Sequence, residues 1–317
     1  MQSQTHEIST LGRTIHVPAV RLGHVTVVMA GTVVTMGEIF DAYWLEAETL
    51  PDLKSCIDQL KSAQHRPDIF TFVQRVPDTT PQFSYHMEWD NVAAIPINTH
   101  ENWFREQISS ASRRNIRTSE KKGITVKVEA YDDRYVRGIM SLYNESPVRA
   151  GRKFWHYRKP FEAVEAENGT YRERSSYLGA YLQNEFIGYM KIVWDTRSAA
   201  IMQILSKLEY RDTRPNNALL SHAVKLCEQR GVRHLLYERF VYGNKGEDSL
   251  TRFKKDNGFI RVDLPRYYIP LTMKGQLALF FGLHRDAKDL VPQRVRKQLV
   301  DLRDRWYSTR FKALRGA

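Results

Sequence analysis

The sequence predicts a mixed α/β (α+β) protein, in which a mostly antiparallel twisted sheet is flanked by helices. Three observations support this prediction. First, strand-like and helix-like segments follow each other in a regular order after Gly123. Second, 42% of the residues are hydrophobic and 26% are charged, a globular composition that excludes a disordered or collagen-like chain. Third, the 317 residues are enough for two domains of about 150 residues each.

The first domain, residues 1–105, is predicted to be a smaller, diverged α/β domain. Its most apolar run is too short to span a bilayer and indicates buried strands. Helical spacing of Leu53, Ile57 and Leu60 indicates a helix, and prolines after position 76 break the pattern. The expected elements are one or two strands at 25–36, a helix around 53–60, a strand at 68–74 and loops between Pro77 and Pro96.

The second domain, residues 106–272, is predicted from a clearer succession of elements. Val136, Ile139 and Tyr143 share one helical face, and their helix ends before Pro147. The expected helices are 98–122, 136–143, a short piece after Pro160, 215–231 and 248–257. The expected strands are 124–129, 177–182, 185–194, 199–206, 234–241 and 267–271, with a hairpin turn at 183–184.

This order of elements, β-α-α-β-β-β-α-β-α-β, resembles the GCN5-related N-acyltransferase (GNAT) fold. The run from Phe253 to Phe259 (FKKDNGF) matches the aromatic–x–x–x–x–Gly–Phe phrase that ends the fourth helix of many such enzymes. The resemblance implies that Gly258 adopts a left-handed conformation and that Phe259 packs under the sheet. It covers about residues 110–272.

A narrower resemblance lies at the start of the second domain. Residues 112–124 (SRRNIRTSEKKGI) resemble the basic helix-to-strand segment of FemAB-like acyltransferases, GNAT relatives that include peptidoglycan aminoacyltransferases. These proteins often pair two GNAT-like halves, so residues 1–105 are expected to be a degenerate half. The resemblance implies transfer of an acyl or aminoacyl group from acetyl-CoA, another acyl-CoA or an aminoacyl-tRNA to an amine on a small-molecule, anionic or cell-envelope acceptor. The competing hypothesis is a non-catalytic module that binds nucleic acid or an anionic surface.

The resemblance places the phosphates of the donor just after the strand at 199–206. Enzymes that use acetyl-CoA carry R/Q-x-x-G-x-G/A there; in this chain Arg211 leads, Arg214 and Asn216 hold the glycine positions, and Pro215 removes one amide. A helix N-terminus can still receive an anion at this point. The candidate donor-binding residues are therefore Arg211, Arg214, Asn216 and Asn217.

Candidate acid–base residues also follow from the resemblance. The position of the acid that protonates the leaving group holds Lys254, and Tyr242 is a substitute in the preceding loop. Lys254 serves as an acid if burial lowers its pKa; the alternative is a lysine on a solvated helix face. Glu209 is the candidate base, with Asp195 or Gln203 acting through water as alternatives, or else Glu209 is an ordinary surface carboxylate.

The loop 147–160 interleaves aromatic and basic side chains and, by the resemblance, lies over the acceptor. Aromatic faces beside guanidinium groups suit a ring-bearing anionic ligand. The alternative is a structured Ω-loop whose aromatic side chains pack on the sheet. The candidate acceptor-binding residues are Arg149, Arg152, Trp155, His156, Tyr157 and Arg158.

Positive charge is concentrated in three stretches of the chain. The 48 Lys and Arg residues outnumber the 36 Asp and Glu residues, for a net charge of +12. Residues 105–122, 145–160 and 285–317 together carry +14, which leaves the other 250 residues at −2. Such an excess indicates anionic partners, with tRNA as one candidate.

The third stretch predicts a basic amphipathic helix at 292–314, within a tail that begins at 273. Its apolar stripe consists of Val295, Leu299, Leu302 and Trp306. Such a helix either docks on its own domain or makes peripheral contact with a membrane surface.

Other classes of site have no support in the sequence. Cys56 and Cys227 are far apart and are expected to be reduced thiols of a cytoplasmic protein. The N-terminal residues lack the basic and apolar pattern of a signal peptide. The ten histidines include no H-x-x-x-H pair, so no metal is expected.

Overall fold

The computed structural model describes residues 4–10, 13–23, 25–41, 52–242 and 248–285, and the chain divides into two compact units. The first unit comprises residues 1–92 and 261–291, and the second comprises 93–260 and 292–317. The last strand, expected in the second domain, therefore groups almost entirely with the first unit. The amphipathic helix expected at 292–314 lies outside the described residues.

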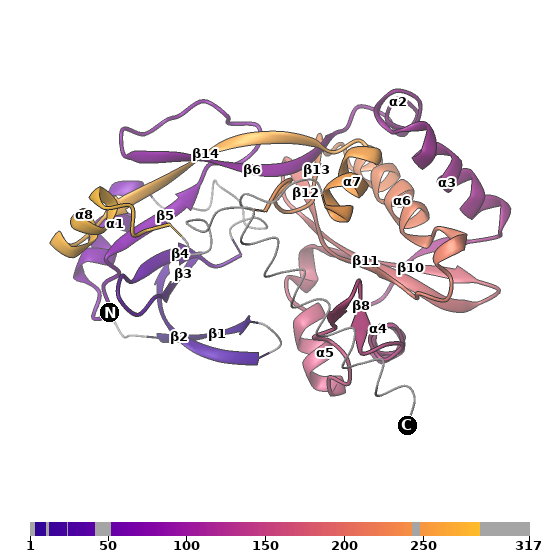
Figure 1. Cartoon of the computed structure of the whole chain (residues 1–317), viewed down its shortest axis with the longest axis horizontal. Coiled ribbons are helices and arrows are strands. Elements are labelled where there is room, and N and C mark those ends of the chain that lie inside the picture. Colours follow the sequence, from indigo (N-terminus) through magenta and orange to yellow (C-terminus); the bar gives the residue numbers. More distant parts are fainter. Residues whose placement is uncertain (1–3, 11–12, 24, 42–51, 243–247, 286–317) are drawn as a thin grey trace. The chain divides into compact units, whose positions relative to one another are not determined.

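In its described residues, the first unit has a sheet with the strand order β1-β2-β3-β4-β5-β14-β6, together with helices α1 and α8 (Figure 1). Strands β4 and β5 are parallel, whereas β1/β2, β2/β3, β3/β4 and β5/β14 are antiparallel pairs. The elements are β1 (Gln4–Thr10), β2 (Arg13–Leu22), β3 (Val25–Ala30), β4 (Met36–Ile39), α1 (Leu53–Ser62), β5 (Ile69–Val73), β6 (His86–Pro96), β14 (Ile260–Pro270) and α8 (Met273–Phe280).

The core of the first unit forms where α1 covers the sheet. Cys56 and Leu60 are fully buried on α1 and join a cluster that contains Phe70 and Tyr267. The predicted helical face and the predicted strands at 25–36 and 68–74 are thereby confirmed. Cys56 is a free thiol, and so is Cys227 in the second unit.

The loops expected between Pro77 and Pro96 are in part a strand. Strand β6 has 11 residues and ends at Pro96, where the missing N–H leaves the rest of the ladder intact. The prolines predicted a loop-rich segment, but Pro96 instead lies at the end of a strand.

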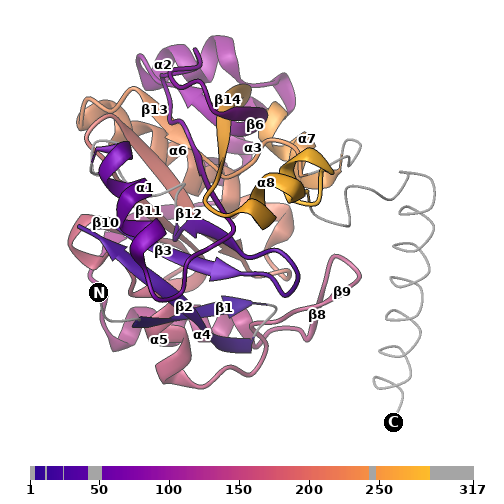
Figure 2. The ribbon, with the colours of Figure 1, turned by 90° about the vertical axis from the view of Figure 1, so that its left-hand side faces the viewer.

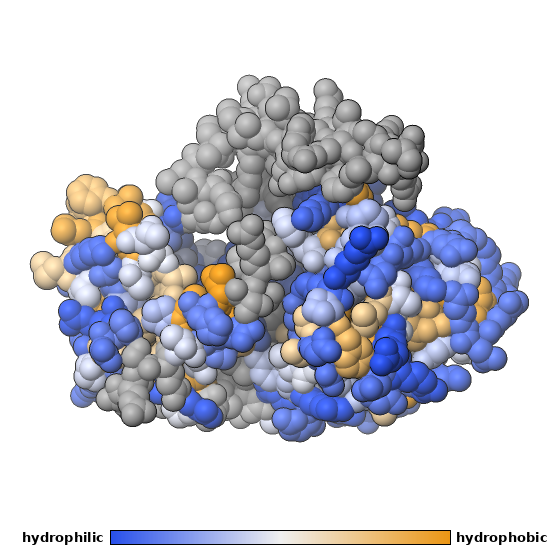
Figure 3. All heavy atoms as spheres, turned by 90° about the horizontal axis from the view of Figure 1, so that it is seen from below, coloured by the Kyte–Doolittle hydropathy of each residue, from blue (hydrophilic) through white to orange (hydrophobic). Residues whose placement is uncertain are grey.

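Helix α8 leaves an apolar surface uncovered by the other described residues. Met273, Leu277, Phe280, Phe281 and Leu283 are between 57% and 83% exposed. Figure 3 shows these apolar side chains gathered at the left margin, over α8. Among the helices in the described part of the chain, none is long and apolar enough to cross a membrane.

The second unit is a sheet with the order β6-β13-β12-β11-β10-β7. Figure 1 shows α3, α6 and α7 on one face of this sheet and α4 and α5 on the other. The elements are α2 (His100–Asn102), the π-helical turn η2 (Trp103–Gln107), α3 (Ser110–Lys121), β7 (Thr125–Glu129), α4 (Asp133–Tyr143), β8 (Val148–Arg149), β9 (Arg152–Lys153), α5 (Phe161–Asn168), η3 (Arg172–Arg174), β10 (Ser175–Leu182), β11 (Glu185–Trp194), β12 (Ser198–Ser206), η4 (Arg211–Thr213), α6 (Pro215–Gln229), β13 (His234–Leu236) and α7 (Ser249–Asp256).

The end of α7 agrees with the predictions made for Gly258 and Phe259. Gly258 has φ of +84°, and Phe259 is buried in the core that includes Trp103. The Trp103 indole Nε1–H donates to the Asn257 carbonyl at 3.0 Å. A Cβ at position 258 would lie 3.1 Å from that same Nε1, so both conformation and space favour glycine here.

Two predicted elements of the second unit are wrong in length. The helix expected at 98–122 is interrupted because Ile108 is extended and Ser109 caps a new helix, its side chain accepting from the Ser112 N–H. The strand expected at 234–241 ends at Leu236, and Glu238 then takes a left-handed φ of +46°. Strand β13 is consequently too short to pair along the whole of β12.

Candidate functional site

The candidate site begins where β12 and β13 part. Their parallel pairing joins Ser198–Ala200 to His234–Leu236, whereas on its other edge β12 pairs with β11 from Ala199 to Ser206. Side chains of β12 are buried up to Ile201 and partly exposed from Met202 onward. The sheet of the second unit therefore opens between the end of β12 and the segment 237–242.

Lys254 lies buried beside this opening. Its side chain projects inward from α7 with 0% exposure, and its ammonium Nζ donates to the Arg239 carbonyl at 2.6 Å. The same Nζ lies 4.6 Å from the centre of the Tyr237 ring and 5.2 Å from that of Tyr242. Burial lowers the pKa of Lys254 to about 8, although the nearby carboxylates of Glu238 and Asp248 oppose the shift. The solvated-face alternative for Lys254 is wrong, because α7 turns this side chain into the unit.

Glu238 and Tyr242 complete a cluster with Lys254. The Tyr242 hydroxyl donates a short hydrogen bond to Glu238 Oε2. The left-handed backbone of Glu238 is uncommon for a residue with a Cβ and is a strained conformation that often occurs at functional sites. The structure thus brings together two predicted residues, Lys254 and Tyr242, and adds Glu238. No sequence pattern marked Glu238, since it lay within a predicted strand.

Glu209, the candidate base, follows the end of β12 and is exposed. Its backbone N–H donates to Glu145 Oε1 at 2.9 Å. Its carboxylate is not a partner of Lys254 within the described residues. The candidate base is therefore exposed, unlike the buried Lys254.

The candidate donor-binding residues lie at the start of α6. Arg214 is the N-cap with φ of +63°, so this former glycine position keeps a left-handed backbone while carrying a side chain. Arg211 and Arg214 are exposed. Asn217 is buried and its amide Nδ2 donates to Asn257 Oδ1 at 3.0 Å, which commits it to joining α6 and α7. Asn216 Oδ1 is buried without a hydrogen-bond partner among the residues that the structure describes.

The base of loop 147–160 is tied to the end of β12. The Arg149 guanidinium donates to Glu145 Oε2 and to the carbonyls of Leu142 and Ser206, each at 2.8 Å. Glu145 in turn accepts from the Leu208 N–H at 2.7 Å. Arg149 is therefore engaged inside the protein, contrary to an expected role in direct acceptor binding.

The tip of the loop presents its aromatic and basic side chains to solvent. Trp155 is 45% exposed, with the Lys153 ammonium 5.3 Å from its ring centre. The Arg158 guanidinium lies 5.2 Å from the centre of the Tyr157 ring. Figure 2 shows the β8–β9 hairpin of this loop projecting from the second unit. His156 differs, because its ring centre lies 4.5 Å from that of Tyr143 and its Nδ1 lies 3.6 Å from Glu167 Oε2.

The loop is thus part scaffold and part exposed surface. Arg149 and His156 support the Ω-loop alternative through their internal contacts. Arg152, Trp155 and Arg158 are exposed, and Tyr157 is partly exposed, so these four remain the acceptor candidates. The sequence pattern could not separate the two groups, because both consist of aromatic and basic residues.

Comparisons with known proteins test the fold. No protein-family model matches the sequence, and neither does any curated protein. Among solved structures, FemX is similar with a TM-score of 0.55 and 11% identity, over 88% of this chain and 90% of the FemX chain. A second similar structure is the C-terminal DUF2156 domain of a protein described as a lysylphosphatidylglycerol synthetase from Agrobacterium fabrum. Its TM-score is 0.53 and its identity 11%, over 84% of this chain and 87% of that domain. L-PGS from Bacillus licheniformis has a TM-score of 0.51 and 12% identity, over 81% of this chain and 84% of the L-PGS chain.

These similarities agree with the element order of the second unit. From β7 onward, apart from short turns and the β8–β9 pair, the elements run β7-α4-α5-β10-β11-β12-α6-β13-α7-β14, as predicted, although β14 groups with the first unit. The chain therefore shares its overall fold with FemX, and this fold is GNAT-like as predicted.

Proposed function

We propose that this protein is an N-acyltransferase that moves an acyl or aminoacyl group from an activated donor to an amine. The buried Lys254 with its lowered pKa, placed at the opening of a FemX-like sheet, is the observation that carries the proposal. Burying an ammonium without a carboxylate in direct contact destabilises the fold. Lys191 is also fully buried, but it bonds to Thr170 and has no part in the proposed step.

In the proposed step, the acceptor amine attacks the carbonyl carbon of the donor. A C–N bond forms, the bond to the leaving oxygen or sulfur breaks, and protonated Lys254 gives its proton to that leaving atom. The amine loses a proton to solvent or to Glu209, which is exposed where β12 ends. The Tyr242–Glu238 pair keeps a carboxylate near Lys254, which favours its protonated form.

The start of α6 favours an aminoacyl-tRNA over an acyl-CoA as donor. A pyrophosphate cradle needs bare backbone N–H groups, but Arg214 and Asn216 carry side chains and Pro215 has no N–H. The exposed guanidinium groups of Arg211 and Arg214 instead suit a phosphodiester backbone. Similarity to a lysylphosphatidylglycerol synthetase domain agrees with transfer of an aminoacyl group.

A donor-binding experiment tests this proposal. Filter binding of aminoacyl-tRNA at increasing salt is expected to show affinity falling steeply with salt, and Arg211→Ala with Arg214→Ala is expected to reduce the slope by about 2. The matched control is Arg134→Ala with Arg137→Ala, two exposed arginines of α4, with little change expected. Thermal stabilisation by acetyl-CoA but not by tRNA would contradict the aminoacyl donor and restore the acyl-CoA alternative.

Catalysis is tested separately from binding. The protein is incubated with tRNAs that carry labelled amino acids and with a mixture of amine-bearing cell-envelope precursors, and label is followed from tRNA to the acceptor fraction. Transfer supports the enzyme proposal. Tight tRNA binding without transfer to any acceptor would favour the non-catalytic binding module.

Trp155 gives a prediction for the acceptor. Trp155→Ala is expected to raise KM for the acceptor by roughly 10-fold with little change in kcat, because loss of one stacking contact weakens binding by about 1–3 kcal/mol. The matched control is Trp89→Ala, an exposed tryptophan of the first unit at 56% exposure. Equal KM and kcat values for the two variants would show that the loop tip does not bind the acceptor.

A further inference from the structure

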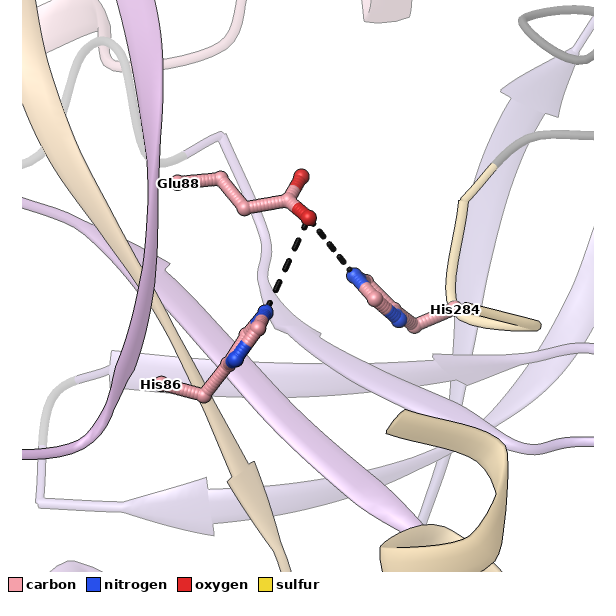
Figure 4. Close-up of side chains that lie close together, drawn as sticks. All are labelled: His86, Glu88 and His284. Carbon is pink, nitrogen blue, oxygen red and sulfur yellow. Dashed lines mark hydrogen bonds and ion pairs between the residues drawn. The ribbon is translucent and has the colours of Figure 1, made fainter. Parts of the chain in front are cut away.

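Two histidines and a glutamate converge in the first unit, away from the candidate site. His86 and Glu88 stand two residues apart on β6, so their side chains point to the same face of the strand. His284 follows α8 and projects toward them (Figure 4). One ligand atom from each residue lies within 4.8 Å of the other two.

The distances suit a shared ion. His284 Nε2 lies 3.0 Å from Glu88 Oε1, and His86 Nε2 lies 3.7 Å from the same oxygen. Ligands about 2.1 Å from a tetrahedral Zn²⁺ lie roughly 3.4 Å from each other, which falls between these two values. Small side-chain rotations would bring all three atoms into range.

Several groups converge on one oxygen of Glu88. His284 is 1% exposed, so its imidazole is enclosed by protein. Glu88 Oε1 also faces the Arg285 guanidinium, whose Nη2 and Nε lie 2.9 Å and 3.0 Å away. Both histidines and this arginine are thus directed at one oxygen. In one tautomer the imidazole Nε2–H donates to this oxygen, and in the other tautomer the Nε2 lone pair can bind a metal ion.

We propose that His86, Glu88 and His284 form a divalent metal site, with Zn²⁺ as the ion that this set of two nitrogens and one oxygen fits best. Neutral imidazoles would direct their lone pairs at the ion, and the Glu88 carboxylate would supply its negative charge. Water would complete the coordination. The ion would fasten the turn after α8 to β6, a role within the first unit that is independent of acyl transfer.

The sequence did not predict this site. His86 and His284 are 198 positions apart, and the spacing His-x-Glu on a strand has no metal-binding signature of its own. This proposal therefore replaces the sequence-based expectation that the protein binds no metal.

Isothermal titration of the metal-free full chain with Zn²⁺ tests the proposal. One Zn²⁺ per chain is expected to bind at this site, and His86→Ala and Glu88→Gln are each expected to weaken binding by at least about 10-fold. His86 and Glu88 are partly exposed, so these variants are expected to fold even if His284→Ala does not. The control is His16→Ala, another histidine beside a glutamate, whose variant is expected to bind Zn²⁺ like the original chain.

Arg285→Gln distinguishes a metal site from an ion-pair cluster. Removing this cation from Glu88 is expected to tighten Zn²⁺ binding severalfold, because metal and guanidinium compete for one carboxylate. Replacing Zn²⁺ with Co²⁺ gives a visible spectrum that reports nitrogen and oxygen ligation. Absence of binding, or equal affinity of His86→Ala, Glu88→Gln and His16→Ala, would overturn the proposal and leave a hydrogen-bonded cluster.

Discussion

Lys254→Met is expected to reduce the rate of acyl transfer by a factor of roughly 10²–10⁴ while donor binding is retained. Methionine fills a similar buried volume but has no proton to give to the leaving atom. The measurement is kcat under saturating donor, with the tRNA-binding affinity of the same variant as a check on folding. Lys255→Met, at the adjacent exposed position of α7, is the matched control.

The pH dependence of transfer gives a second test of Lys254. An acid with a pKa of about 8 is protonated below that value, so kcat is expected to fall as pH rises through about 8. Lys254→Met is expected to lose this limb of the profile. A lysine acting as a base would instead give a rate that rises through the same pH range, which would exclude the proposed role.

As pH rises through about 8, the stability of the fold is expected to increase, whereas kcat is expected to fall. The folded pKa of Lys254 lies below its unfolded value of 10.5, so the unfolded chain binds more protons between about pH 8 and 10.5. The contribution of this residue to stability is therefore unfavourable below pH 8 and improves as pH rises. Urea unfolding at pH 7 and pH 10 measures it, and Lys254→Met is expected to gain stability relative to the original chain only at pH 7.

Arg149→Met is expected to destabilise the protein by roughly 3 kcal/mol. The Arg149 and Glu145 side chains are 12% and 18% exposed, so the variant leaves a largely buried carboxylate without its cation. It also leaves the Leu142 and Ser206 carbonyls without the guanidinium donor. Chemical unfolding of the second unit, followed by tryptophan fluorescence, is the measurement.

Arg152→Met is the control for this prediction, because Arg152 is exposed in the same loop. The double variant Glu145→Gln with Arg149→Met is expected to lose less than the sum of the two single losses, as coupled partners do. Equal stability of Arg149→Met and Arg152→Met would show that the ion pair contributes little to anchoring the loop.

Most elements of the second unit were predictable because local signals agree with the tertiary structure. The 183–184 hairpin has left-handed φ values of +48° and +70°, which match a tight turn. Gly231 and Gly258 end their helices with positive φ. Strand β13 was overextended, since the residues after Leu236 keep a strand-like composition but leave the sheet at Glu238.

The candidate site was less predictable, because burial and partners depend on contacts distant in sequence. Composition suggested a solvated lysine at position 254, yet packing of α7 places its ammonium against the Arg239 carbonyl. The sequence showed that Arg214 and Asn216 occupy the two glycine positions at the start of α6. It did not predict that Arg214 keeps a left-handed backbone.

The amino-acid sequence specified the order of strands and helices, the GNAT-like fold of residues 110–272 and the three basic stretches, since these depend on periodicity, turn residues and composition. The tertiary structure decided which basic and aromatic residues act as scaffold, as Arg149 and His156 do, and which face solvent, as Trp155 does. It also placed His86 beside His284 and Glu238 beside Lys254. Exposure, pKa and metal-ligand geometry are properties of surroundings, and chain folding supplies those surroundings from positions that local patterns do not connect.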